Sequence, residues 1–172
     1  MGRYKYIPRG TAGGWIKSQD SPVIGGALGT VFDCCVRKEN EGYRMWYSWR
    51  PAKGIAVANS PDGYDWSLPQ MVMPRQINLP WAVDEVNRPC VLYRGGKYRM
   101  WFIGMVRPLD FCYGTSAVGY AESNDGIHWD VRRESVMNPD EPWEKNSLYC
   151  PHVIWDEEKN SYRMWYSGGE QY

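Results

Sequence analysis

An aromatic hexapeptide occurs three times along the chain. YRMWYS occupies positions 43–48, YRMWFI positions 98–103, and YRMWYS again positions 162–167. The copies are roughly 60 residues apart, which is the spacing of a repeated supersecondary unit. A repeat of this size indicates a fold built by stacking similar units, so it constrains the architecture more than any other feature.

Two further motifs keep the same spacing. The form S-x-D-G-x-x-W appears at positions 60–66 and 123–129, after the strand-like stretches GIAVANS and VGYAES. A short apolar motif precedes each hexapeptide, as CCV at 34–36, PCV at 89–91 and PHV at 151–153. The pattern predicts one domain, 1–172, with units of four strands at approximately 15–66, 67–129 and 130–172.

The strands are predicted from residue type and periodicity. Tyr, Trp, Phe and Val alternate between Gly, Asp, Asn and Pro, and no stretch has a helical apolar period, so the class is all-β. Both faces of YRMW carry bulky side chains, which favours a β-propeller blade over a sandwich strand with one solvated face. We expect antiparallel four-stranded blades, of which about two and two-thirds are present. The chain is then either a fragment of a longer protein or self-associates to cover its open blade edges.

Composition excludes several functional classes. Ten Trp, thirteen Tyr and a hydrophobic share of 43% predict a globular core. Lys plus Arg equals Asp plus Glu at 20 each, without a basic run, so no nucleic-acid partner is expected. No signal peptide or long apolar window is found, which predicts a cytoplasmic protein without a membrane partner. The five cysteines form no CxxC, and the two histidines are His128 and His152, so we expect reduced thiols, no metal and no cofactor.

The candidate site follows from the alignment of the inner strands. In a propeller the first strand of each blade lines the central channel, so equivalent positions converge there. Alignment on the final Val of the third motif puts Asp33, Arg88 and Cys150 in one column. Two residues further, and on the same face by the strand period, are Cys35, Cys90 and His152. Trp81 and Trp143 align at the channel mouth.

YRMWYS, GYAESNDGIHW and an Asp-bearing first inner strand together resemble the five-bladed β-propeller glycosidases, which include glycoside hydrolase families 43, 32, 62, 68 and 130. The resemblance extends from Trp15 to Tyr172. It implies a five-bladed fold and hydrolysis of a glycosidic bond by carboxylate acid/base catalysis. Asp33 in VFDCCV matches the general base or nucleophile of that superfamily. Tyr149 in LYCPHV stands where family 43 has its acidic Glu.

Because Tyr149 is not acidic, the general acid that the resemblance implies must be another carboxylate. A glycosidase needs one carboxyl group to protonate the leaving oxygen and a second to attack or activate water. Glu85, Glu144 and Glu170 are the candidates for the acid. Each has a plain structural alternative, as a solvated or ion-paired loop residue, and Asp33 could cap a turn.

The remaining candidates would bind substrate. Arg88 could hold a carboxylate or a phosphate, His152 resembles the P-H of family 43, and Trp81 and Trp143 could stack on sugar rings. Packing is the alternative for both tryptophans and a core position for His152. The recurring arginines of YRMW indicate a repeated structural contact.

These residues leave three functional hypotheses. The first is a glycosidase acting on a carbohydrate. The second is a non-catalytic glycan-binding protein or truncated propeller remnant, and the third is a glycoside phosphorylase.

Overall fold

The computed structural model describes residues 18, 21–107 and 114–170. Their regular structure is almost entirely β, with two short 3-10 turns, η2 (Gly26–Leu28) and η3 (Arg50–Ala52). The all-β prediction is therefore confirmed. In the described part of the chain, no helix has the length and apolarity that crossing a bilayer requires.

The first unit forms a four-stranded antiparallel sheet, which we call blade 1. Its strands lie in the order β1 (Val31–Glu39), β2 (Gly42–Trp49), β3 (Gly54–Ser60) and β4 (Gln70–Met73). The first copy of YRMWYS lies in β2. The hexapeptide is therefore paired on both edges, with β1 on one side and β3 on the other.

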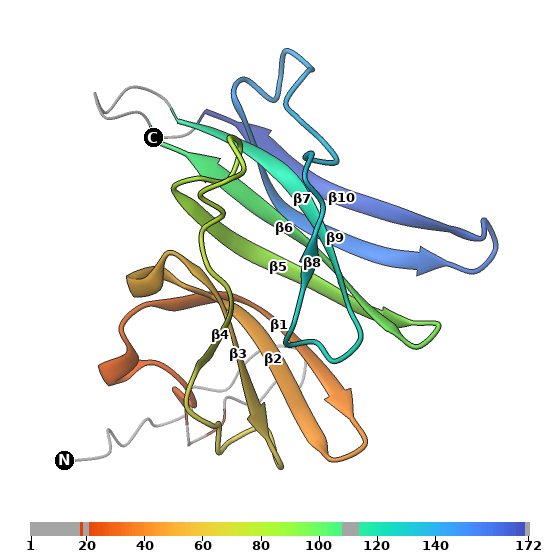
Figure 1. Cartoon of the computed structure of the whole chain (residues 1–172). Coiled ribbons are helices and arrows are strands. Elements are labelled where there is room, and N and C mark those ends of the chain that lie inside the picture. Colours follow the sequence, from red (N-terminus) through yellow and green to blue (C-terminus); the bar gives the residue numbers. More distant parts are fainter. Residues whose placement is uncertain (1–17, 19–20, 108–113, 171–172) are drawn as a thin grey trace.

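The second and third units continue the pattern (Figure 1). Blade 2 consists of β5 (Glu85–Arg94), β6 (Lys97–Val106), β7 (Thr115–Ser123) and β8 (Asp130–Val131). Blade 3 consists of β9 (Ser147–Asp156) and β10 (Ser161–Gly169). A parallel pairing at Ser116 and Ser147 joins β7 to β9, so blades 2 and 3 share one six-stranded sheet.

The tryptophan of the hexapeptide packs between blades where a following blade is present. Trp46 is 0% exposed and Trp101 is 7% exposed, and each belongs to a core cluster that contains residues of two blades. Trp165 holds the same position in β10 and is 51% exposed. The hexapeptide is thus an interblade packing element, as its two bulky faces predict.

The Asp-Gly turns are built by local hydrogen bonds. Asp125 Oδ1 accepts the amide N–H groups of Ile127 and His128, each at 2.8 Å. Gly126 has a φ of +75°, which is the left-handed region that glycine enters without steric cost. Asp62 and Gly63 form the same turn in blade 1.

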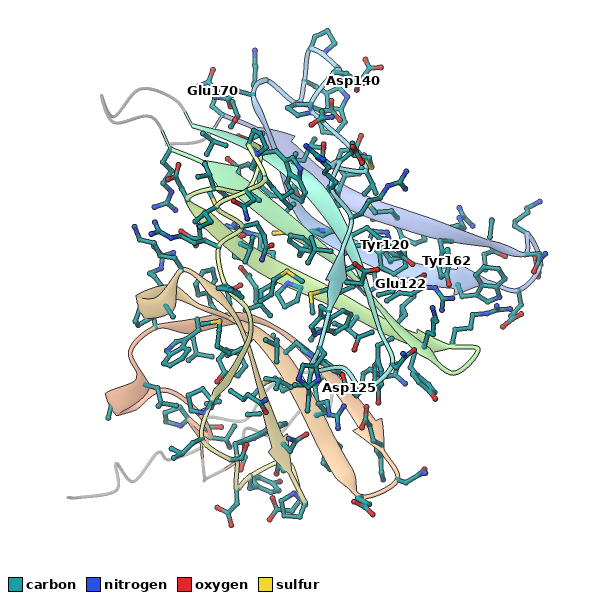
Figure 2. All side chains as sticks on the ribbon, in the orientation of Figure 1. Tyr120, Glu122, Asp125, Asp140, Tyr162 and Glu170 are labelled. Atoms are coloured by element: carbon teal, nitrogen blue, oxygen red, sulfur yellow. The ribbon has the colours of Figure 1, made fainter. Side chains whose placement is uncertain are left out.

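One of these turns also joins two blades. The side chain of Arg44 donates to the Asp125 carbonyl at 2.6 Å, and the indole N–H of Trp46 donates to the Gly126 carbonyl at 2.8 Å. Figure 2 shows Asp125 where its turn reaches down to blade 1. The predicted structural role of the hexapeptide arginine is therefore seen at Arg44, which ties blade 1 to blade 2.

Candidate functional site

Each inner strand contains a β-bulge at the same place. The register of β1, β5 and β9 shifts between Phe32 and Cys35, between Asn87 and Cys90, and between Tyr149 and His152, respectively. The aligned residues Asp33, Arg88 and Cys150 sit at these bulges with φ of 50°, 53° and 50°. A non-glycine residue adopts this conformation at a cost, and a bulge redirects its side chain. The three aligned positions therefore share one unusual backbone geometry.

The bulges border a groove of about 590 Å³ that all three inner strands line. Arg88 Nε lies 3.4 Å from Asp33 Oδ2, which makes an ion pair between neighbouring blades. The guanidinium of Arg88 also lies over the ring of Tyr149, 5.2 Å from its centre, and donates to Asn87 Oδ1 at 2.9 Å. Both charged side chains remain partly exposed, at 34% for Asp33 and 23% for Arg88. A ligand in the groove could therefore reach them.

Blade 1 fixes the backbone of Arg88. Its amide N–H donates to Ser48 Oγ at 2.8 Å, and Ser48 is only 1% exposed. A bulged residue loses a ladder hydrogen bond, and this serine supplies the replacement. Neither this contact nor the ion pair between Asp33 and Arg88 has a signal in the sequence spacing.

Two inner-strand cysteines line the same groove. The strand period placed Cys35 and Cys90 on the same face as Asp33, and all three residues line the groove. The two thiol groups also accept the amide N–H of Val91 and of Val153, each at 3.2 Å, and pack against the interblade cores.

His152 holds the position of these cysteines in β9. It pairs with Trp165 as Cys35 pairs with Trp46, and its side chain is exposed beside the groove. Its role in substrate binding stays a prediction.

Glu85 is buried at the start of β5. Only 4% of the residue is exposed, Oε1 accepts Asn87 Nδ2 at 2.8 Å, and Oε2 is 3.0 Å from the guanidinium of Arg107. Neighbouring side chains therefore engage both of its oxygens. Its exchange of a proton with a substrate would require these contacts to open.

Glu144 organises the loop before β9. Its Oε2 accepts the amide N–H groups of Asp140 and Glu141, each at 2.7 Å, and its Oε1 accepts the hydroxyl of Tyr166 at 2.7 Å. These hydrogen bonds, with that of the Glu141 amide the strongest, lower the pKa of Glu144. A general acid of a glycosidase needs a raised pKa, so this environment favours a structural carboxylate.

The other predicted binding residues differ in accessibility. Trp81 is held by a hydrogen bond to the Arg133 carbonyl at 2.9 Å and packs tightly against the backbone of Gly104 and Gly119. Trp143 is 53% exposed and stacks on Tyr166 with ring centres 5.5 Å apart. About half of Trp143 is therefore open to solvent, whereas Trp81 packs against two strands of blade 2.

Glu170 is exposed just after β10, and Figure 2 shows it at the same end of the molecule as Asp140. The described residues contain no group of three or more His, Cys, Asp and Glu side chains that could hold a metal ion.

Replacing Glu144 with glutamine should lower the melting temperature at pH 7, because a neutral amide accepts the two loop N–H groups less strongly. The folded-state pKa lies below the ordinary value of 4.5, so the stabilisation is present above about pH 4.5 and is lost as pH falls through the folded pKa. Thermal unfolding of wild type and Glu144→Gln from pH 7 to pH 3 should show a difference in melting temperature that narrows as the pH falls.

The matched control is Glu141→Gln, because it is the backbone N–H of Glu141, and not its side chain, that donates to the Glu144 carboxylate. Equal melting temperatures for wild type and Glu144→Gln at pH 7 would contradict the structural role of Glu144.

The cysteines should differ in reactivity. Cys34 and Cys150 are exposed, whereas burial raises the pKa of Cys90 to about 11 and also raises that of Cys35. At pH 8 a thiol of that pKa is ionised in about one molecule in a thousand, and only the thiolate reacts. Iodoacetamide followed by peptide mass spectrometry should label Cys34 and Cys150 first. Early labelling of Cys90 would contradict its burial between blades. Cys112 lies outside the described residues.

Comparison with known proteins identifies the architecture. A family 117 glycoside hydrolase of Zobellia galactanivorans, Zg3597, superposes with a TM-score of 0.64 at 18% identity, covering 74% of this chain and 46% of that one. A thermostable family-43 glycoside hydrolase gives 0.60 at 19% identity, covering 79% and 41%. An alpha-L-arabinofuranosidase from Lactobacillus brevis gives 0.61 at 14% identity, covering 80% and 45%.

The chain has the β-propeller fold of these glycoside hydrolases. The propeller prediction is thus confirmed, and the bulged inner strands are the first strands of propeller blades. The chain spans less than half of each of these glycoside hydrolases.

Sequence comparison adds relatives from Mycobacterium tuberculosis. Uncharacterized protein Rv1502 of Mycobacterium tuberculosis is 28% identical over 129 residues, which are 69% of this chain and 38% of that protein. No protein-family model matches the chain.

Proposed function

We propose that this propeller chain contains a glycoside-cleaving site in which Asp33 is the general base or nucleophile. The observation that carries the proposal is the position of Asp33 at a bulge on the first inner strand, paired with Arg88 from the next blade. A bulge that redirects a charged side chain toward a groove is a typical device of binding and catalytic sites. The propeller fold shared with glycoside hydrolases makes a carbohydrate the expected substrate.

The acid of this reaction is assigned to Glu170. Cleavage of a glycosidic bond requires a proton donor on the side of the ring opposite the attacking group. Hydrogen bonds to neighbouring residues engage the carboxyl groups of Glu85 and Glu144, and those of Glu144 lower its pKa. Glu170 is exposed beyond the end of β10, which suits exchange of a proton with substrate and water.

A second candidate function is glycan binding without cleavage. The observation that favours it is the ring of Tyr149 under the guanidinium of Arg88, at the inner-strand position where the resemblance implies an acidic Glu. Tyr149, Arg88 and the exposed ring of Trp143 would then bind a sugar through stacking and charge. An acidic sugar would suit the guanidinium best.

A panel of aryl glycosides, assayed with the 172-residue chain, separates the candidates. Release of the aryl group supports cleavage, and dependence of that release on inorganic phosphate indicates a phosphorylase that uses Arg88. Calorimetric titration with the matching free sugars tests binding. Binding without release supports the second candidate, whereas the absence of both contradicts a carbohydrate site.

A further inference from the structure

A buried carboxylate and a buried amide lie next to Arg88 and have no part in the proposed cleavage. Glu85 is 4% exposed and Asn87 is 1% exposed. Burying a polar side chain is unfavourable unless new hydrogen bonds replace those to water. Each of the two finds such a partner in the other, because Asn87 Nδ2 donates to Glu85 Oε1 at 2.8 Å.

These two residues connect the groove to the protein surface through one line of polar contacts. At the groove, Arg88 pairs with Asp33 and donates from Nη1 to Asn87 Oδ1 at 2.9 Å. Beyond Asn87, Glu85 Oε2 lies 3.0 Å from the guanidinium of Arg107, whose side chain is 49% exposed. We call Arg88, Asn87, Glu85 and Arg107 the Arg88 relay. Each contact along it joins a donor to an acceptor.

The amide of Asn87 has one favourable orientation. Its oxygen faces a guanidinium, which only donates hydrogen bonds, and its nitrogen faces a carboxylate, which accepts them. The nitrogen also lies 2.9 Å from Sδ of Met105. Turning the amide over would set nitrogen against the guanidinium and oxygen against the carboxylate. Glu85 therefore fixes the amide, and the amide fixes the guanidinium of Arg88.

The bulge allows these neighbouring residues to meet. Successive side chains of a regular strand point to opposite faces, so residues i and i+1 are normally kept apart. Asn87 pairs with Ile103 in the ladder, and the register shifts directly after it, where Arg88 has a φ of 53°. The guanidinium can then reach the side chain of the preceding residue.

The polar support accompanies the arginine rather than the bulge. In the alignment of the inner strands, the equivalents of Asn87 are Phe32 in blade 1 and Tyr149 in blade 3. Both of these are aromatic, although their blades have the same bulge. Blade 2, which carries Arg88, has an amide at this position.

We propose that Asn87 and Glu85 are positioning residues that hold the guanidinium of Arg88 ready for a ligand in the groove. Nη1 is taken by Asn87 and Nε faces Asp33, whereas Nη2 makes no hydrogen bond with any residue in the described part of the chain. Nη2 is then the atom that donates to an acceptor oxygen of the ligand. The role of the ligand rests on the proposed carbohydrate site, but the relay itself does not.

Hydrogen exchange of the Arg88 Nε–H group tests the relay without any substrate. Nε is buried, so its proton is shielded from water. Asn87→Ala removes the acceptor of Nη1 and frees the guanidinium to move into solvent. Exchange measured by proton–nitrogen NMR, with the signal identified by its absence in Arg88→Lys, should be at least about tenfold faster than in wild type.

A second variant keeps the test sharp if Asn87→Ala does not fold. Glu85→Gln is close in size and leaves an acceptor oxygen for Asn87, but it removes the negative charge, so exchange should accelerate by less than in Asn87→Ala. The matched control is Asn59→Ala, because Asn59 also accepts from an arginine, at 3.0 Å from Arg44 Nε, in blade 1. Exchange at the wild-type rate in either relay variant, or equal acceleration in Asn59→Ala, would overturn the relay.

Steady-state kinetics on an aryl glycoside that the chain cleaves test the consequence for the ligand. Since Arg88 contacts the ligand before and during the reaction, Asn87→Ala should raise KM at least about threefold and leave kcat within about twofold. A merely loosened fold would lower kcat at unchanged KM, and that result would exclude a positioning role. If no aryl glycoside is cleaved, the proposed cleavage fails, whereas the exchange rates still decide whether the relay holds Arg88.

Discussion

Replacing Trp46 with alanine is expected to lower the free energy of unfolding by about 3–5 kcal/mol. The side chain is fully buried, donates to the Gly126 carbonyl at 2.8 Å, and packs against the rings of Tyr98 and Trp129. Alanine removes that packing and leaves a cavity between blades 1 and 2. Urea unfolding followed by circular dichroism measures the change.

The matched control for Trp46 is the tryptophan in the same motif position of blade 3. Trp165 is 51% exposed, so Trp165→Ala should change the free energy of unfolding by less than about 1 kcal/mol when measured at concentrations where the chain is monomeric. The same substitution in the same motif then separates the contribution of interblade burial from that of the residue type. Equal losses at both positions would contradict the role of Trp46 as an interblade contact.

Replacing Asp33 with asparagine should reduce turnover of any aryl glycoside that the chain cleaves by about 10²- to 10⁴-fold. Asparagine keeps the size of the side chain, and it tolerates the left-handed backbone at this bulge. It cannot take up a proton or form a glycosyl ester. Steady-state kinetics should therefore show a loss in kcat rather than a rise in KM.

Two controls separate a loss of catalysis in Asp33→Asn from misfolding. The ion pair with Arg88 is partly exposed, so its loss should change stability by at most about 1 kcal/mol, and the melting temperature checks this. Asp130→Asn is the matched control, because Asp130 is an exposed residue of β8 in the outer part of blade 2. Full activity of Asp33→Asn would show that Asp33 is not a catalytic residue.

The sequence predicted the strands and the register because the hexapeptide and the Asp-Gly turn are local signals with fixed spacing. Tyr43–Ser48 lies in β2 and Tyr98–Ile103 in β6, each paired with a strand of the G-x-A-x-S type. Alignment on Val36, Val91 and Val153 placed Asp33, Arg88 and Cys150 in equivalent positions, and the structure finds them at equivalent bulges.

The parts that escaped prediction depend on contacts between blades. A bulge adds one residue without an obvious sequence mark, so the left-handed backbone of Asp33 and Arg88 was not predicted. The network of Glu144 depends on the path of a loop that brings two amide groups to one carboxylate. The pairing of Asp33 with Arg88 depends on how closely blade 2 packs on blade 1. Such distances are set by tertiary packing, which spacing along the chain does not encode.

The shared bulge has a consequence for how the site can change over evolutionary time. The three blades keep one backbone shape at this point while carrying an acid, a base and a thiol, so the side chain can be exchanged without altering the blade. Each blade thereby brings one interchangeable group to the same groove. A propeller of this kind can acquire a new ligand preference, or lose its chemistry, through single substitutions at these three bulged positions.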